Sequence, residues 1–87
     1  MSRPFILVGD PIDHGGAVVS GSQASDVDGR PVARIGDQVI CSLHGPTVIV
    51  SGDTTLIVDG QPIARHGDTT ACGAHLIAGQ FHASVDA

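Results

Sequence analysis

The amino-acid sequence predicts a small all-β fold in which one structural unit is repeated. Residues 20–37 and 51–68 align at an offset of 31 positions, and ten of the eighteen aligned positions are identical. The identical positions include the whole pattern Asp-Gly-x-Pro-x-Ala-Arg-x-Gly-Asp. A repeat of this length is typical of folds that arrange copies of one supersecondary unit.

The composition favours strands over helices. All nine acidic residues are Asp, all four basic residues are Arg, and Glu and Lys are absent, while Gly occurs twelve times and Pro five times. Glu and Lys favour helices, whereas Gly, Pro and Asp disfavour them, and Val, Ile and Thr favour strands. A chain of 87 residues has room for one domain. Because so short a chain buries only about 60–65 % of its unfolded surface, we expect an interaction other than apolar burial to stabilise the fold.

Short apolar or β-branched runs alternate with turn signals along the chain. Asp28-Gly29 and Asp59-Gly60 lie between such runs and predict tight hairpins, because Gly supplies the positive φ that these turns require. Each repeat therefore consists of a strand, an Asp-Gly hairpin, a second strand and a Gly-Asp corner. Strands are expected at Phe5–Val8, Ala17–Ser20, Pro31–Ile35, Gln38–Ile40, Val48–Ser51, Thr54–Val58, Ile63–His66 and Ala74–Ala78.

The Gly-Asp corners divide the chain into three units. They stand at Gly9-Asp10, Gly36-Asp37 and Gly67-Asp68. After Gly79 the third unit has no Asp-Gly-x-Pro-x-Ala-Arg hairpin, so we interpret it as cut short. We expect the units to surround a pseudo-threefold axis within one domain that spans residues 1–87.

Charge and hydropathy exclude several classes of function. The net charge is −5, and four Arg do not make the basic face that nucleic acid or anionic lipid requires. No apolar run approaches the roughly 20 residues of a membrane helix, and the first ten residues are too soon interrupted to form a signal peptide. We expect a protein made in the cytoplasm, where thiols stay reduced and Cys residues more often bind metal than form disulfides.

Potential metal ligands stand at one place in each unit. His14, Cys41 and Cys72 each lie four positions after a corner Asp, and His44 lies in the longer turn of the second unit. Around a pseudo-threefold axis these side chains converge on one point. Cys41-x-x-His44 has a common metal-ligand spacing, and thiolate with imidazole favours Zn²⁺ over Mg²⁺ or Ca²⁺. We predict one structural Zn²⁺, whose ligation contributes roughly 10–16 kcal/mol in small domains.

Other interpretations of these residues stay open. Cys41 and Cys72 can be buried apolar thiols, with His14 and His44 as solvated turn residues. His75, three positions after Cys72, can replace one ligand. For His66 and His82, a surface or packing role is expected instead.

An enzymatic interpretation is weaker. Cys41 or Cys72 with His44 or His75 and an orienting Asp has the parts of a nucleophilic centre. However, no aromatic residues accompany them to form a pocket, and four protein ligands around zinc leave no open position for a catalytic water. We expect a protein that is not an enzyme. A free-standing zinc-binding module or a small Cys/His hydrolase is the alternative.

The motif arginines and prolines have structural interpretations. Because Arg34 and Arg65 recur at equivalent positions, we expect each to serve its own unit, by bonding carbonyls or by pairing with the corner residues Asp37 and Asp68. Pro31 and Pro62 fix φ after the hairpin and remove a backbone donor at an edge.

Several segments resemble a known family. Arg30-Pro31-Val32-Ala33-Arg34 and Gln61-Pro62-Ile63-Ala64-Arg65 resemble the Pro-Ala-Ala-Arg motif of the PAAR-repeat family, with Val32 and Ile63 in place of the first Ala. The resemblance covers nearly the whole chain. It also includes His14-Gly15-Gly16, Cys41-Ser42-Leu43-His44-Gly45 and Gly67-Asp68-Thr69-Thr70-Ala71-Cys72-Gly73-Ala74. The motif positions are Pro31, Ala33, Arg34, Pro62, Ala64 and Arg65.

The resemblance implies a small β-cone with zinc near its point. Such a cone caps the trimeric β-helical VgrG spike of a type VI secretion system, and the assembly is driven through a target membrane. Family sites with three His and one Cys imply a competing ligand set of His14, His44, Cys72 and His75.

The resemblance also implies where the protein acts and with what. A chain that is a monomer on its own would stay cytoplasmic until firing and then be injected without a signal peptide. Because no toxin or other extension domain is present in residues 1–87, effectors would be carried non-covalently or by the spike protein.

Overall fold

A computed structural model describes residues 2–27, 29–79 and 84–86 of the chain, and within these residues it contains strands and no helix. The fold is all-β, as the composition predicts. The strands are β1 (Ser2–Pro4), β2 (Gly16–Val18), β3 (Asp26–Val27), β4 (Arg30–Pro31), β5 (Gln38–Cys41), β6 (Gly45–Val48), β7 (Asp53–Val58), β8 (Gln61–Ile63) and β9 (Ser84–Asp86).

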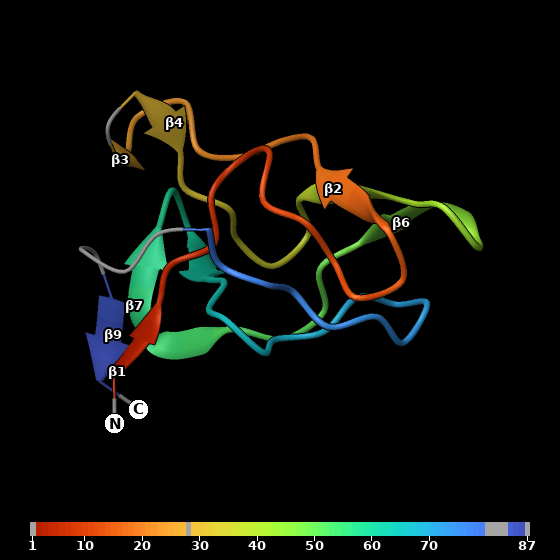
Figure 1. The fold of residues 1–87 in the computed structure, drawn as a ribbon. Coiled ribbons are helices and arrows are strands. Elements are labelled where there is room, and N and C mark those ends of the chain that lie inside the picture. The colour runs from red at the N-terminus through yellow and green to blue at the C-terminus, as the bar shows by residue number, and fades with distance from the viewer. Residues whose placement is uncertain (1, 28, 80–83, 87) are drawn as a thin grey trace.

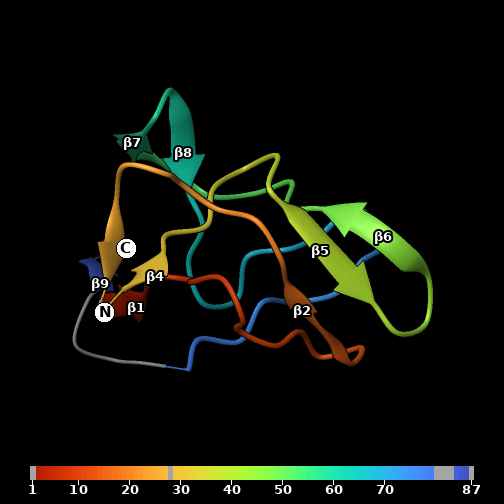
Figure 2. The same ribbon diagram turned by 90° about the horizontal axis from the view of Figure 1, so that it is seen from above.

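The strands form four small antiparallel sheets (Figures 1 and 2). Three are two-stranded pairs, β1 with β9, β3 with β4 and β7 with β8, and the fourth is a three-stranded sheet in the order β2-β5-β6. Asp59 and Gly60, in the turn of the β7–β8 hairpin, both have positive φ, at 51° and 82°. This is the backbone that the Asp-Gly pair predicts, because a type I′ turn requires positive φ at both central positions.

A closed ring of backbone hydrogen bonds joins the three units. The Ile6 N–H donates to the Ala64 carbonyl at 3.1 Å, the Ala64 N–H to Ala33 at 2.9 Å and the Ala33 N–H to Ile6 at 2.8 Å. Each of these residues is fully buried. Since the pattern returns to its start after three bonds between equivalent residues, the units surround a pseudo-threefold axis. The two motif alanines lie on that axis, where a larger side chain would meet the other two units.

Two more rings repeat the same symmetry at other levels of the molecule. In one ring, the N–H of each residue before a corner Gly donates to the Pro carbonyl of another unit. In the other ring, the acceptor is the carbonyl of the residue directly after the corner Asp of another unit. The first comprises Val8 to Pro31, Ile35 to Pro62 and His66 to Pro4; the second comprises Val19 to Gln38, Val50 to Thr69 and Ile77 to Pro11.

Each Gly-Asp corner is a turn held by two hydrogen bonds, in which each of the same two residues donates to the other. The Asp37 N–H donates to the Arg34 carbonyl at 3.0 Å, and the Arg34 N–H donates back to the Asp37 carboxylate at 2.7 Å. Asp68 with Arg65, and Asp10 with Leu7, make the same pair of bonds. The corner Gly has φ near 90° in all three units, a conformation that Gly adopts without steric cost.

The terminal segments complete the third unit. The strand β1 pairs with β9, with Ser2 opposite Asp86 and Pro4 opposite Ser84. In the rings, Pro4 occupies the place of Pro31 and Pro62. The third unit is therefore not cut short, because its last strand comes from the start of the chain. The segment from Pro4 to Asp10 is a degenerate third copy of the motif.

The apolar core has two parts along the axis. A larger cluster includes the ring residues Ile6, Ala33 and Ala64 and extends to the candidate ligand Cys41. It contains Ile6, Ile12, Val18, Ala33, Val39, Cys41, Ile49, Ala64, Ala74, Leu76 and Ala78. A smaller cluster, of Leu7, Val32 and Ile63 with Phe5, Val27 and Val58 packed against it, lies on the side of the hairpins β3–β4 and β7–β8.

Several expected strands are shorter than predicted. The segments at Phe5–Val8 and Ala74–Ala78 make isolated bridges, such as Leu7 with Val32 and Ile12 with Leu76, in place of continuous ladders. The reason is the threefold arrangement, because a segment that passes between two units pairs with each only briefly. Conversely, β6 contains Gly45 and Pro46, where the sequence predicts no strand. These residues pair with Cys41 and Ile40 of β5.

The two ends of the molecule differ. The pairs β1–β9, β3–β4 and β7–β8 lie at one end, and the turns that follow the corners lie at the other (Figure 1). The molecule measures 29 × 27 × 22 Å; a taper to a point stays a prediction. Within the described residues no helix has the length and apolar character to span a membrane. We call the hairpin end the base and the turn end the apex.

The corner carboxylates are expected to be necessary for stability. In the Asp37→Ala variant, the Arg34 guanidinium and N–H lose a buried partner, and the loss of one partner of a buried pair costs about 3–5 kcal/mol. We expect chemical denaturation to show a decrease of that order in the free energy of unfolding. Asp26→Ala, at an exposed Asp in β3, is the control and should change it by less than about 0.5 kcal/mol. Equal effects of the two substitutions would contradict this account of the corners.

Candidate metal centre

Equivalent turns at the apex carry His14 and Cys72. The Gly15 N–H donates to the Ile12 carbonyl at 3.1 Å, and the Gly73 N–H donates to the Thr70 carbonyl at 3.0 Å. Each ligand candidate is thus the third residue of a four-residue turn that ends in Gly. Gly15 and Gly73 have φ of 79° and 89°, which explains why Gly follows the ligand candidate in both units.

The second unit holds Cys41 and His44 in a hairpin. Cys41 is the last residue of β5 and pairs with Gly45, the first residue of β6, so that His44 is the last residue of a three-residue loop. Gly45, the first residue of β6, has φ of 79°, a conformation that Gly adopts without steric cost. Val18 and Leu76 lie eight positions after their corner Asp, whereas their equivalent Ile49 lies twelve positions after Asp37. The longer turn therefore adds His44 to the set.

A glycine allows the first unit to approach Cys41 closely. Gly16 lies opposite Cys41 in the pairing of β2 with β5. A Cβ at Gly16 would lie 1.9 Å from the Ile40 carbonyl oxygen, so no other residue fits there without displacement of the strands. The pair Gly15-Gly16 therefore both shapes the His14 turn and places it beside the hairpin of the second unit.

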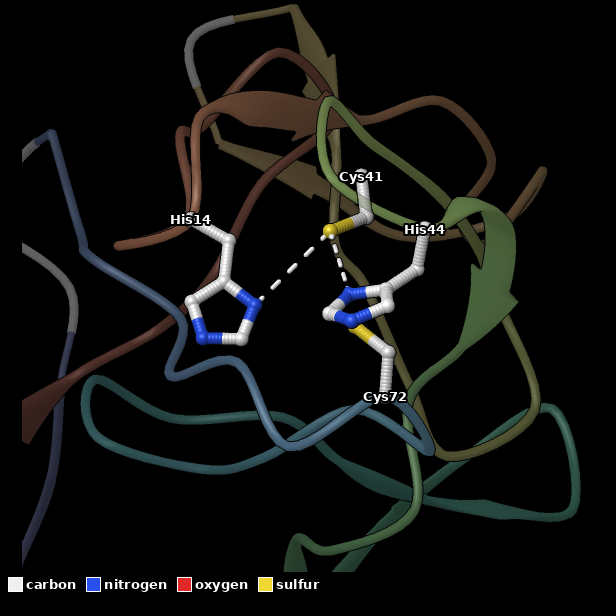
Figure 3. Close-up of side chains that lie close together, drawn as sticks. All are labelled: His14, Cys41, His44 and Cys72. Carbon is white, nitrogen blue, oxygen red and sulfur yellow. Dashed lines mark hydrogen bonds between the residues drawn. The ribbon is translucent and has the colours of Figure 1, made fainter.

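The four side chains point toward one another from three turns (Figure 3). Their ligand atoms all lie within 4.8 Å of one another. The Cys41 Sγ lies 3.8 Å from the His14 Nδ1 and 3.5 Å from the His44 Nδ1. A tetrahedral zinc with ordinary Zn–S and Zn–N bond lengths places its sulfur and nitrogen ligands about 3.6 Å apart. The spacing and the donor set of two thiols and two imidazoles therefore fit Zn²⁺.

The thiols of Cys41 and Cys72 differ in burial and in hydrogen bonding. Cys41 is buried at 1 % exposure, whereas Cys72 is half-buried. The Thr70 hydroxyl, 3.1 Å from the Cys72 Sγ, is the main cause that lowers the pKa of Cys72 to about 6. Hydrogen bonds from the Ala74 N–H and from the Cys41 and His14 side chains act in the same direction, against desolvation. Since the thiolate is the form that binds metals, Cys72 is prepared for ligation at neutral pH.

His75 lies outside this group. Its N–H donates to the Asp13 carboxylate at 2.8 Å, and its Nδ1 lies 3.1 Å from the second carboxylate oxygen. The hydrogen bond from the His75 backbone is the main cause that lowers the pKa of Asp13. The structure thus gives His75 a role in joining the third unit to the first. The His66 Nδ1 accepts a hydrogen bond from the Ala78 N–H at 3.0 Å, and His82 is outside the described residues.

The motif arginines pair with the corner carboxylates, as the sequence predicts. The Arg34 Nε and Nη2 bond the two Asp37 oxygens at 3.0 and 3.1 Å, and Arg65 bonds Asp68 at 3.1 and 3.2 Å. These hydrogen bonds raise the pKa of both arginines. A two-point contact between Arg and a carboxylate fixes the orientation of both side chains, so the motif arginines hold the corners in place.

The first corner uses a different arginine, which the sequence analysis did not identify. Leu7 stands where the other units have Arg, and Arg30 reaches Asp10 with its Nη2 at 2.5 Å and the Val8 carbonyl with its Nε at 3.0 Å. An indirect signal was present, because Asp10 recurs with its corner Gly but without the preceding Arg. A buried Asp at 1 % exposure requires a partner from elsewhere in the chain.

Comparison with known proteins identifies the family. The model of the PAAR motif matches residues 8–78. The chain therefore belongs to the PAAR-motif family, the spike-tip family of type VI secretion systems. A search of curated proteins found no significant match.

Metal analysis tests the four-residue centre. We expect the purified chain to hold one Zn²⁺ per molecule, and cobalt substitution to give the absorption of a tetrahedral site with two sulfur ligands. Cys41→Ser should remove that spectrum and weaken metal binding by at least tenfold, because one thiolate and its short contacts with His14 and His44 are lost.

His75→Ala is the matched control, since His75 is an exposed imidazole near the same turn but outside the group. It should leave the cobalt spectrum unchanged. A spectrum that depends on His75 and tolerates Cys41→Ser would replace this ligand set with the three-His, one-Cys alternative.

Proposed function

We propose that this protein caps the blunt end of a trimeric VgrG-type spike, binds one structural Zn²⁺ at its apex and supports effector delivery. Membership of the PAAR-motif family supports this proposal. The observation that carries it furthest is the closed ring of hydrogen bonds between Ile6, Ala33 and Ala64. A single chain with three equivalent backbone units can present a similar face to each chain of a threefold partner.

The base is the end proposed to dock. Each of its three strand pairs has a free edge among the described residues, and such edges can pair with strands of another chain. The strand β7 exposes Thr54 through Ile57 on both faces, including Leu56 at 38 % and Ile57 at 52 % exposure. A strand that is uncharged between Asp53 and Asp59 and exposes Leu56 and Ile57 is suited to burial against a partner.

The metal is proposed to be structural and the protein to be non-enzymatic. Four protein ligands fill a tetrahedral shell and leave no position for a reactive water. His14, Cys41 with His44, and Cys72 belong to the first, second and third units, so a bound ion would join all three at the apex. A tip under mechanical load would then separate only if ligand bonds broke as well as apolar contacts.

The remaining parts of the proposal concern location and cargo. The protein is proposed to reside in the cytoplasm before firing and to be injected with the spike, in transient contact with a target membrane. Effectors are proposed to travel non-covalently on the assembly.

Docking can be tested by reconstitution with the spike protein. We expect light scattering after size exclusion to give one chain per VgrG trimer. Ile57→Asp at the base should weaken the complex by at least tenfold, because a charge would be buried at the interface. Leu43→Asp is the matched control, since Leu43 is equally apolar and 69 % exposed but lies beside His44 at the apex.

Two results would contradict the proposal. One is the absence of any complex with the folded, metal-loaded chain. The other is hydrolysis of model ester or amide substrates that Cys41→Ser abolishes, which would favour the Cys/His hydrolase.

A further inference from the structure

We propose that Cys41 and Cys72 are a redox pair that forms an intramolecular disulfide when oxidised by peroxide and thereby releases the apical metal. The metal-release part rests on the proposed zinc site, whereas the disulfide part rests only on the geometry of the two thiols. Both cysteines are free in the structure, and their sulfur atoms lie no more than 4.8 Å apart.

The backbone fixes one thiol between two strands and places the other in a surface turn. Cys41 ends β5 and pairs with Gly16 of β2 and Gly45 of β6, so strands on both sides fix its position. Cys72 lies in a surface turn between the exposed residues Ala71 and Gly73. A Cβ at Gly73 would meet no atom within 4 Å. Formation of the disulfide requires this turn to shift toward Cys41 until the sulfur atoms reach the S–S bond length of about 2.05 Å.

The difference in exposure sets the order of the reaction. Cys41 is only 1 % exposed, whereas Cys72 is half-buried, so a small oxidant in solution meets Cys72 first. The Cys72 thiolate attacks one oxygen of hydrogen peroxide, the O–O bond breaks, hydroxide leaves and Cys72 becomes a sulfenic acid. The Cys41 thiolate then attacks the Cys72 sulfur, the S–O bond breaks and a second hydroxide leaves. Two electrons pass from the sulfur pair to the peroxide.

Formation of this disulfide changes what holds the apex together. The metal site loses both thiolates and keeps only His14 and His44, which are too few ligands for a closed tetrahedral site. The second and third units remain joined, now by a covalent bond. The first unit would lose only the ligand bond of His14, and it would stay joined to the second unit through the pairing of β2 with β5. Oxidation would thus replace a metal bound by all three units with a disulfide that joins only the second and third units.

The test uses the full chain loaded with zinc and treated with hydrogen peroxide beside a chromogenic zinc chelator. We expect the release of one zinc per chain and the loss of both free thiols. Peptide mapping should find one cross-link between Cys41 and Cys72, with a mass lower by two hydrogens. Dithiothreitol followed by zinc should restore the metal-bound protein. Untreated protein with the chelator measures the background release.

The same treatment of metal-free protein separates the two proposals. A Cys41–Cys72 cross-link in metal-free protein would support the disulfide independently of zinc, whereas failure of the reduced chain to bind zinc would contradict the metal centre alone. Sulfinic or sulfonic acid at Cys72 with Cys41 still reduced would overturn the redox pair, as would cross-links between molecules. In Cys41→Ser, a reagent specific for sulfenic acid should label Cys72 at least tenfold more than in the wild type, because the resolving thiol is absent. Equal labelling would also overturn it.

Discussion

The structure depends on the cyclic hydrogen bonding between Ile6, Ala33 and Ala64. Each of these residues gives its N–H to one unit and its carbonyl to the other, so all three backbones are satisfied without a continuous sheet. This arrangement solves a problem that short strands create, since a chain whose strands have two to six residues cannot satisfy its buried backbone polar groups in long ladders. It also brings the three units so close that only small side chains fit at two of the three positions.

The corners stabilise this arrangement from outside the axis. Each buried corner Asp closes its own turn and binds a guanidinium, and Asp37 and Asp68 also accept a hydrogen bond from the hydroxyl of Ser20 or Ser51. A carboxylate with this many partners is stable in a poorly solvated position, whereas an unpaired one is not. Arg30 shows that the requirement is for a guanidinium at the carboxylate and not for a particular place in the motif. The corner Asp therefore recurs in all three units, because each turn needs its carboxylate. The Arg that pairs with it can stand elsewhere in the chain.

The same symmetry gives the molecule two functional ends. At the apex it gathers the turns of His14, Cys41 and Cys72, and a local expansion adds His44 as a fourth donor. At the base it presents three strand pairs, one of them made from the two ends of the chain. The expansion of the second unit breaks the threefold symmetry only at the apex. A tetrahedral ion needs four donors, and three equivalent positions supply only three.

The sequence by itself determined the all-β class, the repeat and the Gly-Asp corners, and it assigned Arg34 and Arg65 a structural role, either in bonding carbonyls or in pairing with their corner carboxylates. These features are local, since each depends on residues close together in the chain and on the φ that Gly permits. The sequence also singled out the four side chains that meet at the apex, because their spacing from the corners repeats. The tertiary structure alone decided that Pro4 to Asp10 completes the third unit, that Arg30 serves Asp10, and that the competing residue His75 binds Asp13 outside the gathered side chains. Those outcomes depend on which unit lies beside which, and that is fixed by the closure of the ring between residues far apart in the sequence.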